Sequence, residues 1–445
     1  MLAPPPKPRP DRRRVPVADG DVLRGLRGPV MEAVVPPAHT MVPRMKPALR
    51  RGWRDLHTVQ FGMTPAHALT LGPMDQATGD FLDLLNGTRG LALLREEARG
   101  MDLPEGHVDA LVDRLVRAGL VEDAQGGGPA ADALRGKKDV MDRLAPDLAS
   151  LSLTTSAPDE AIRLLAARRS LRVQVRGAGR VGSVLAALLS GAGVGEVDVR
   201  DWGRVEPGDV APGGLPAASV GERRDTAARR AVSAAAPGRP PRRASRTATG
   251  GDDPGFSLVI LAPRDDVDVH APAMAVAEPL VRSGTPHLYA GVVEGTGVVG
   301  PFVLPGETGC AGCLHETRTD RDEAWPRLVA QWRSGSRPRP ARPCDLALAT
   351  TVAGLAAAHA LAFLDGRAPS SAGARWEVSL PGLNWHARPV WPHAACPCGA
   401  AEKGKGEHTS KEEASHETMA VQGSSEESCR KATAPRPAGT WRAHV

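Results

Sequence analysis

Residues 171–206 read LRVQVRGAGRVGSVLAALLSGAGVGEVDVRDWGRVE, a run that predicts a strand, a glycine turn, a helix and a second strand. Valines alternate before the turn, apolar residues then recur at helical spacing, and EVDVR resumes the strand pattern. Gly177, Gly179 and Gly182 form G-x-G-x-x-G, which allows a tight turn and close approach of the backbone to a phosphate. Asp201 follows Gly177 by 24 residues (201 − 177), near the ~20-residue spacing at which a carboxylate meets a ribose hydroxyl. The run predicts a nucleotide-binding βαβ unit; the alternative is a βαβ unit whose glycines serve packing alone.

The composition is that of a globular protein without a secretion signal. A chain of 445 residues has room for two or three domains, and 41% hydrophobic residues can build a core of Ala, Leu and Val. Net charge is only +5, because acids nearly balance bases. The start, MLAPPPKPRPDRRR, lacks the apolar region of a signal peptide, and we expect neither secretion nor a membrane span. Six cysteines in so long a chain favour metal binding over a disulfide scaffold, and we expect a cytoplasmic protein.

Residues 46–123 predict a small winged-helix domain of α+β type. HTVQFG and HALTL have strand patterns, Asp75 is placed to cap a helix, and two further helical patterns precede the strand LVED. Three interpretations remain open: a peptide-binding module, a DNA-binding winged helix and a purely structural cap. The last helix places Asp109 and Asp113 beside Arg114 and Arg117, a poor face for phosphates, which argues against nucleic acid.

The run WRDLHTVQFGMTPAHALTLGPMDQATGDFLDLLNGTRG, with LVDRLVRAGLVEDA, resembles the PqqD-like peptide-recognition domain of ribosomal-peptide-modifying proteins. The resemblance implies that a leader peptide binds within residues 49–123 as an added strand on the small sheet. Around this domain, residues 1–45 are expected to be a disordered lead-in and 124–137 a flexible linker. Residues 138–400 are expected to form the nucleotide-fold domain and 401–445 a disordered tail.

The larger domain resembles the ThiF/MoeB family, relatives of the ubiquitin-activating enzymes. The resemblance rests on GAGRVGSVLAALLSGAGVGEVDVRDWGRVEPGDV, VGERR, SLVILAPRDD, TPHLYAGVVEGTGVVGPFVLPGETGCAGCL and CPCG, in that order. It implies a doubly wound, Rossmann-like α/β sheet that binds ATP and adenylates a C-terminal carboxylate. It also implies that Gly177, Gly179, Gly182 and Asp201 match nucleotide-binding positions.

Several departures from the family pattern bear on ATP chemistry. The family arginine that reaches the triphosphate is replaced by Pro212, and the phosphate lysine is replaced by Arg224. The family's magnesium-holding aspartate falls on Arg264, so Asp265 or Asp266 could substitute only with a shifted backbone. Because phosphoryl chemistry needs magnesium and donors to offset charge, we expect a vestigial site with weak or no adenylation.

Two short cysteine pairs predict a zinc site. Cys310 and Cys313 form C-x-x-C, and Cys396 and Cys398 lie one residue apart near the end of the fold. Two such pairs supply a tetrathiolate with no open position, which gives zinc a structural role. The alternatives are reduced cysteines, local disulfides, or substitution of a ligand by His315 or His393.

Three further features indicate either a function or ordinary packing in the core. Cys344 lies near the position at which ThiF-like enzymes place a reactive cysteine, and neighbouring arginines, among them Arg342, would lower its pKa; a buried cysteine at a helix start is the alternative. Trp325 and Trp332 could anchor a partner or pack on their own sheet. Ala356 and Ala357 would permit close packing at a homodimer interface.

Together these features resemble the scaffold component of azole and azoline (TOMM) peptide synthetases. The resemblance implies a protein that binds a precursor leader peptide and presents it to a YcaO-type cyclodehydratase. The competing hypothesis is an active ATP-dependent adenylyltransferase acting on a carrier or peptide carboxylate. A third class is a nucleic-acid-binding regulator.

Overall fold

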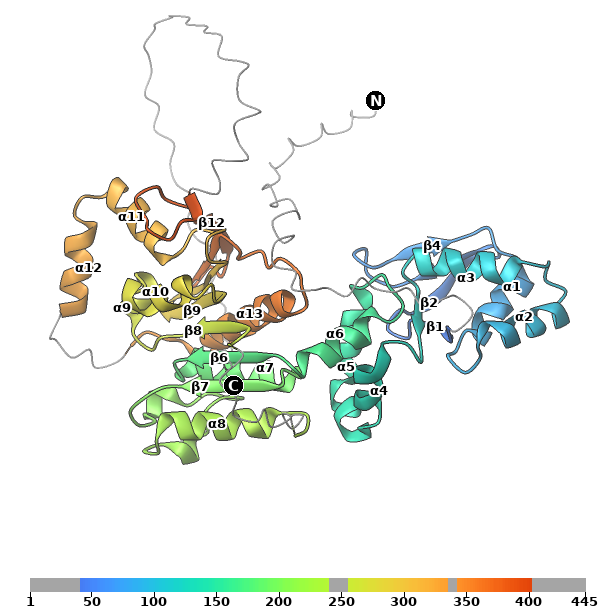
Figure 1. Ribbon diagram of the computed structural model, residues 1–445, viewed down its shortest axis with the longest axis horizontal. Helices are drawn as coiled ribbons and strands as arrows, with labels where there is room; N and C mark the ends of the chain where they lie inside the picture. The colour runs from blue at the N-terminus through green and yellow to red at the C-terminus, as the bar shows by residue number, and fades with distance from the viewer. Residues whose placement is uncertain (1–40, 240–254, 335–341, 402–445) are drawn as a thin grey trace, which may run out of the picture. The chain divides into compact units, whose positions relative to one another are not determined.

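A computed structural model describes residues 41–239, 255–334 and 342–401 (Figure 1). Seven strands form one mixed sheet in the order β12-β11-β10-β9-β8-β6-β7. Strands β7, β6, β8 and β9 are parallel, whereas β9, β10, β11 and β12 are antiparallel. The strand bounds are β6 Arg172–Arg176, β7 Glu196–Arg200, β8 Leu258–Leu261, β9 His287–Val293, β10 Thr296–Val303, β11 Ala374–Ser379 and β12 Trp385–Pro389. The predicted α/β fold is confirmed.

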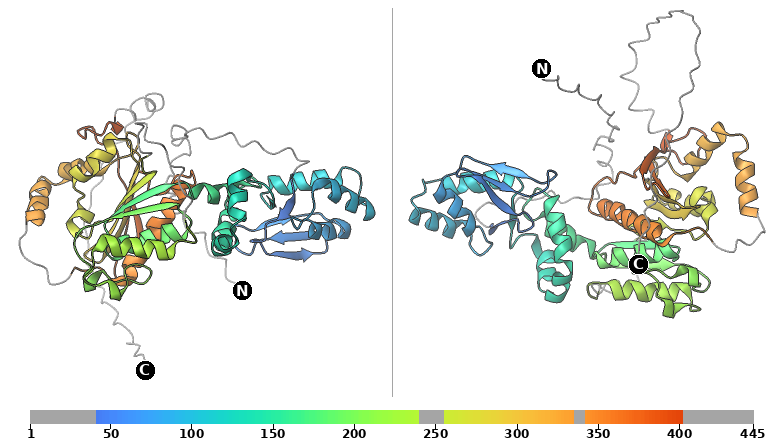
Figure 2. Two further views of the ribbon diagram at one scale, coloured as in Figure 1. Left: turned by 60° about the horizontal axis from the view of Figure 1, so that its bottom comes forward. Right: turned by 180° about the vertical axis from the view of Figure 1, so that it is seen from behind.

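Helices cover both faces of this sheet (Figure 2). Alternate residues of the fully buried strand β8 belong to different cores: Leu258 and Ile260 pack on one face, Val259 and Leu261 on the other. Such a strand reads as a continuous apolar run because it is buried on both sides. The helices are α7 Arg180–Gly191, α8 Arg224–Ala235, α9 Asp266–His270, α10 Met274–Arg282, α11 Ala311–Arg321, α12 Trp325–Ser334 and α13 Leu346–Leu364, with 3-10 helices at Pro207–Asp209 and Ala217–Ser219.

Helix α13 is apolar and long enough, by length and composition, to cross a membrane. In the structure it packs against α7 and strands β9 and β10, and its buried residues belong to the largest core. Ala356 and Ala357 lie in that core, so the prediction that they form a homodimer face is wrong. Small side chains at these positions let the helix approach its own sheet.

The small N-terminal domain contains a three-stranded antiparallel sheet in the order β2-β3-β4. Val59 and Phe61 on β3 and Phe81 on α1 are buried in its core, and Asp75 caps α1 by accepting a hydrogen bond from the Thr78 N–H, as predicted. The bounds are β2 Arg51–Asp55, β3 Thr58–Phe61, β4 Leu69–Leu71, α1 Gln76–Phe81, a 3-10 helix at Leu82–Leu84, α2 Leu91–Gly100 and α3 His107–Arg117. The expected small α+β domain is confirmed.

Two predicted boundaries are wrong. The lead-in predicted for residues 1–45 includes strand β1 (Pro43–Met45), which pairs antiparallel with β5 (Val121–Asp123), and Met41 is buried in the core; residues 1–40 lie outside the described part. The flexible linker predicted for 124–137 contains helix α4 (Gly128–Arg135). Its apolar residues Ala131 and Leu134 are buried with those of α5 (Lys138–Leu153) and α6 (Glu160–Arg168). This burial stabilises the helix although the segment is rich in glycine. The predicted tail lies outside the described residues beyond residue 401.

Candidate functional site

The glycine turn lies at the carboxyl end of β6. The next strand in the chain, β7, lies on one side of β6, and the following strand, β8, lies on the other, so the strand order reverses here. In open α/β sheets, ligands bind at this point. Two of its glycines are also required by the fold itself. A Cβ on Gly177 (φ +108°) would lie 1.9 Å from the Ala262 carbonyl oxygen, and a Cβ on Gly182 would lie 2.1 Å from the Gly177 carbonyl oxygen. Packing alone therefore explains Gly177 and Gly182.

Asp201, the predicted ribose carboxylate, is half-buried, and its side chain is paired with Arg224. Its Oδ1 accepts a hydrogen bond from Arg224 Nη1 at 3.0 Å, and its Oδ2 accepts one from the Ala178 N–H at 2.7 Å. Arg224, predicted to meet a phosphate, also donates to Asp209 at 3.2 Å and to the carbonyl oxygens of Trp202 and Arg204. All three guanidinium nitrogens are thus engaged inside the protein, and the side chain is 4% exposed.

Arg264 lies against the glycine turn and bridges two carboxylates. Its Nε donates to Asp209 Oδ1 and its Nη2 to Glu206 Oε2, both at 2.8 Å. A Cβ on Gly179 would lie 2.9 Å from the Arg264 side chain, so this arginine passes directly over the turn. The hydrogen bond from Arg264 lowers the pKa of Glu206, which keeps that carboxylate ionised.

Asp265, the predicted substitute magnesium ligand, is exposed and caps helix α9 instead. Its Oδ1 accepts hydrogen bonds from the Val267 N–H at 2.8 Å and the Asp268 N–H at 3.4 Å. The capping role follows from its position before the first turn, where an Asp oxygen satisfies unpaired N–H groups.

Cys344, the weak catalytic candidate, lies partly buried just before α13. Arg180 Nη1 at the start of α7 donates to its carbonyl oxygen at 2.8 Å. Burial raises the pKa of the Cys344 thiol despite the opposing effect of Arg180. The expectation of a lowered pKa is therefore wrong, and the thiol is the less reactive form.

The four predicted zinc ligands lie together. The Sγ atoms of Cys310, Cys313, Cys396 and Cys398 are all within 4.8 Å of one another, and all four cysteines are free of disulfides. Three Sγ–Sγ distances are 3.5, 3.6 and 3.9 Å. A tetrahedral zinc with Zn–S bonds of ~2.3 Å places its sulfurs about 3.8 Å apart, so the cluster fits the ion.

The histidines that flank the cysteines have other partners. His393 Nε2 lies 2.8 Å from Asp320 Oδ2, and His315 Nδ1 accepts a hydrogen bond from Trp325 Nε1 at 3.1 Å. Trp325 is buried against His270 and Trp332, so it packs within its own domain. Zinc bound by the thiolates would tie the chain after β12 to the start of α11.

Sequence reasoning named Arg264 and Arg224 but missed what they bind. Asp209 lies in the run GRVEPGDV, and nothing in its local sequence marks it as the partner of two arginines. Asp209 also accepts a hydrogen bond from the Glu206 N–H at 2.9 Å, which fits the general preference of Asp for capping positions.

The comparisons with known proteins agree with this fold. The ThiF family model matches residues 159–400. Escherichia coli MccB, solved with a succinimide, is 15% identical with a TM-score of 0.56 over 80% of this chain and 98% of that one. MccB solved with ATP is 16% identical, with a TM-score of 0.55 over 80% and 99%. Selenomethionine PaaA is 15% identical, with a TM-score of 0.56 over 78% and 99%.

A search of curated proteins finds no significant match. The family model covers more than half of the sequence, and its matched residues include the glycine turn, the arginine–carboxylate network and the four clustered cysteines. The chain belongs to the ThiF family.

Proposed function

We propose that this protein binds the leader of a ribosomally made precursor peptide and presents it to a YcaO-type cyclodehydratase that forms azolines. Its own adenylation site does not carry magnesium ATP. The loss of ATP chemistry is supported most strongly by the position of Arg264. Its guanidinium is hydrogen-bonded to both Asp209 and Glu206 at the glycine turn.

Magnesium ATP is a poor fit to these side chains. Magnesium needs carboxylate oxygens free to join water and phosphate oxygens around it. Here Asp209 is shared between Arg224 and Arg264, and Asp201 is occupied by Arg224 and two backbone N–H groups. Each carboxylate is neutralised by an internal cation, and no phosphate-directed role remains for Arg224.

The small domain offers an edge on which a peptide strand can pair. Strand β2 is bonded to β3 on one side only in the described residues, and all five of its residues are exposed. The Gly62 N–H donates to the Arg50 carbonyl oxygen at 2.8 Å, which sets the alternation of the ladder. By that alternation, the N–H and C=O of Arg51 and Trp53 point away from β3, toward an added strand.

Side chains beside this edge are positioned to contact the side chains of a bound peptide. Trp53 is 48% exposed and lies over Gly79 of α1, and Arg51 pairs with Asp83 at 2.6 Å. Strand addition obtains affinity from main-chain bonds and specificity from alternate side chains. The microcin C7 biosynthetic enzyme MccB, whose fold is similar, was solved in complex with N-formylated MccA.

The test uses Arg51→Pro with Arg51→Ala as its matched control. Both variants lose the pair with Asp83, but only proline removes the outward N–H, and Pro is tolerated at the first residue of an edge strand. We expect Arg51→Pro to weaken the binding of a labelled leader peptide by about tenfold relative to Arg51→Ala. Equal affinities would exclude strand addition at β2.

The delivery step has its own measurement. Cyclodehydration by a YcaO-type enzyme is followed by mass spectrometry with this chain and with the Arg51→Pro variant. The proposal expects azoline formation with the first and a large loss with the second at limiting peptide. Azoline formation that is independent of this chain would refute the scaffold role.

A further inference from the structure

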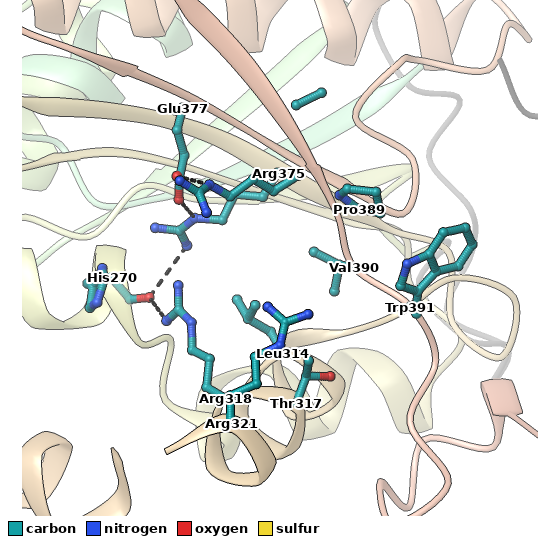
Figure 3. Close-up of a pocket in the computed structure, with 12 residues that line it drawn as sticks. His270, Leu314, Thr317, Arg318, Arg321, Arg375, Glu377, Pro389, Val390 and Trp391 are labelled. Atoms are coloured by element: carbon teal, nitrogen blue, oxygen red, sulfur yellow. Dashed lines mark hydrogen bonds and ion pairs between the residues drawn. The ribbon is translucent and has the colours of Figure 1, made fainter. Parts of the chain in front are cut away.

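A cavity of about 490 Å³ lies beside helix α11 and strands β11 and β12 (Figure 3). It shares no residue with the glycine turn or with the arginine–carboxylate network described above. Four of its twelve lining residues are arginines, and one is a carboxylate. The lining residues that the argument uses most are Leu314, Arg318, Arg321, Arg375, Val390 and Trp391.

Arg375 is the most unusual of these residues. Its side chain is 2% exposed, yet Nη2 has no hydrogen-bond partner among the described residues. Its Nε donates to Glu377 at 2.8 Å and its Nη1 to the Val269 carbonyl oxygen at 3.1 Å. A buried donor without a partner is costly, and such groups are rare in native proteins. Arg375 therefore adds a buried, incompletely bonded cation to the wall of the cavity.

Arg318 approaches Arg375 from the opposite wall. Both donate to the His270 carbonyl oxygen, at 2.7 and 3.5 Å, so two guanidinium groups converge on one acceptor (Figure 3). Burial, reinforced by Arg375, lowers the pKa of Arg318 to about 10. Burial and the same arginines lower the pKa of His270 to about 4, so the imidazole is neutral at pH 7. The positive charges of Arg318 and Arg375 therefore lie close together, and Glu377 is the carboxylate beside them.

Two further arginines, Arg388 and Arg321, add positive charge to the cavity wall. Arg388 donates to Glu377 at 2.8 Å, so that single carboxylate is shared by two cations. Arg321 is exposed on the last turn of α11 and forms no ion pair with the described residues. Guanidinium groups match carboxylates and phosphates through parallel N–H bonds, and a desolvated pocket strengthens such bonds.

The cavity wall also contains apolar side chains. Leu314, Val390 and the 73%-exposed Trp391 lie beside the arginines. A pocket with a few convergent polar groups in an apolar lining is typical of small-molecule sites. An aromatic ring next to guanidinium groups suits an anion attached to a flat apolar body.

We propose that this pocket binds an oxyanion, phosphate or carboxylate, carried by an apolar or aromatic body. Arg318 and Arg321 meet the oxyanion, the buried charge of Arg375 lies behind them, and Val390 and Trp391 contact the attached body. This inference is independent of the leader-binding proposal and of any chemistry at the glycine turn.

Isothermal titration calorimetry on the full, zinc-loaded chain tests this with three probes: phenyl phosphate, phenylacetate and inorganic phosphate. The expected result is one site per chain for a phenyl probe, with tighter binding than inorganic phosphate. Phenyl phosphate and phenylacetate share a ring, so their relative affinity identifies the oxyanion. Arg321→Glu should weaken binding by about tenfold or more, because it removes a charged donor and adds repulsion.

The matched control is Arg327→Glu, which makes the same charge change at an exposed residue of α12 outside the pocket. It should bind the probes normally, as should Arg264→Ala at the glycine turn. The proposal is overturned if no probe saturates at millimolar concentration, if Arg321→Glu binds as the wild type does, or if Arg264→Ala abolishes binding. Inorganic phosphate binding as tightly as phenyl phosphate would overturn the apolar half of the site.

Discussion

Removing the guanidinium of Arg264 should destabilise the protein by an amount that the contacts define. Its bond to Asp209, a side chain 5% exposed, is a buried charge-assisted hydrogen bond worth about 1.5–3 kcal/mol. Its bond to Glu206, 65% exposed, adds about 0–1 kcal/mol. Because Asp209 keeps Arg224 in the variant, we take the lower part of the range, about 2 kcal/mol for Arg264→Ala.

For a domain of this size the loss corresponds to a fall of about 4–8 °C in Tm. Differential scanning calorimetry would measure it at pH 7 and again in acid. Arg264 lowers the folded pKa of Glu206 below the ordinary 4.5, so this contribution is present above that pH and disappears as the pH falls through the folded value. The difference between wild type and variant should shrink in acid.

The control for this experiment is Arg282→Ala, which breaks an exposed pair with Glu278 on helix α10 and should leave Tm unchanged. A change for Arg264→Ala no larger than that of the control would refute the view that Arg264 neutralises the site.

Three further outcomes follow from the same contacts. Cys398→Ser should reduce bound zinc from one per chain and lower Tm, as read by elemental analysis and thermal unfolding; full retention of zinc would exclude the tetrathiolate. Asp365→Asn should cost about 3 kcal/mol in denaturant unfolding, because it breaks a buried bidentate pair with Arg168; a loss below about 1 kcal/mol would contradict that. Gly182→Ala, whose Cβ would lie 2.1 Å from a carbonyl oxygen of the glycine turn, should destabilise by about 3 kcal/mol or more, whereas Gly208→Ala, with open space around it, should be near neutral; equal unfolding midpoints would contradict the packing role.

The sequence predicted the main fold because its local signals agree with its tertiary contacts. The strand, turn and helix of residues 171–206 have the expected periods, and these coincide with β6, α7 and β7. The cysteine cluster could also be predicted, because metal-ligand spacing is a local pattern even though the two pairs are distant in sequence.

Other features depended on contacts that local patterns do not encode. Helix α4 has a glycine-rich sequence, but burial of Ala131 and Leu134 against neighbouring helices stabilises it. The alanine face of α13 suited a dimer interface and its own core equally well, and only the fold distinguishes them. The pocket around Arg375 joins β11, β12 and α11, so no single stretch of sequence indicates it.

ATP–pyrophosphate exchange in the presence of magnesium and precursor peptide is the most direct test of the claim that internal ion pairs have replaced ATP chemistry at the glycine turn. We predict no exchange above background for the wild-type chain. Magnesium-dependent exchange, stimulated by the peptide and lost on mutation of Asp201, would contradict the account and identify the protein as an active adenylyltransferase.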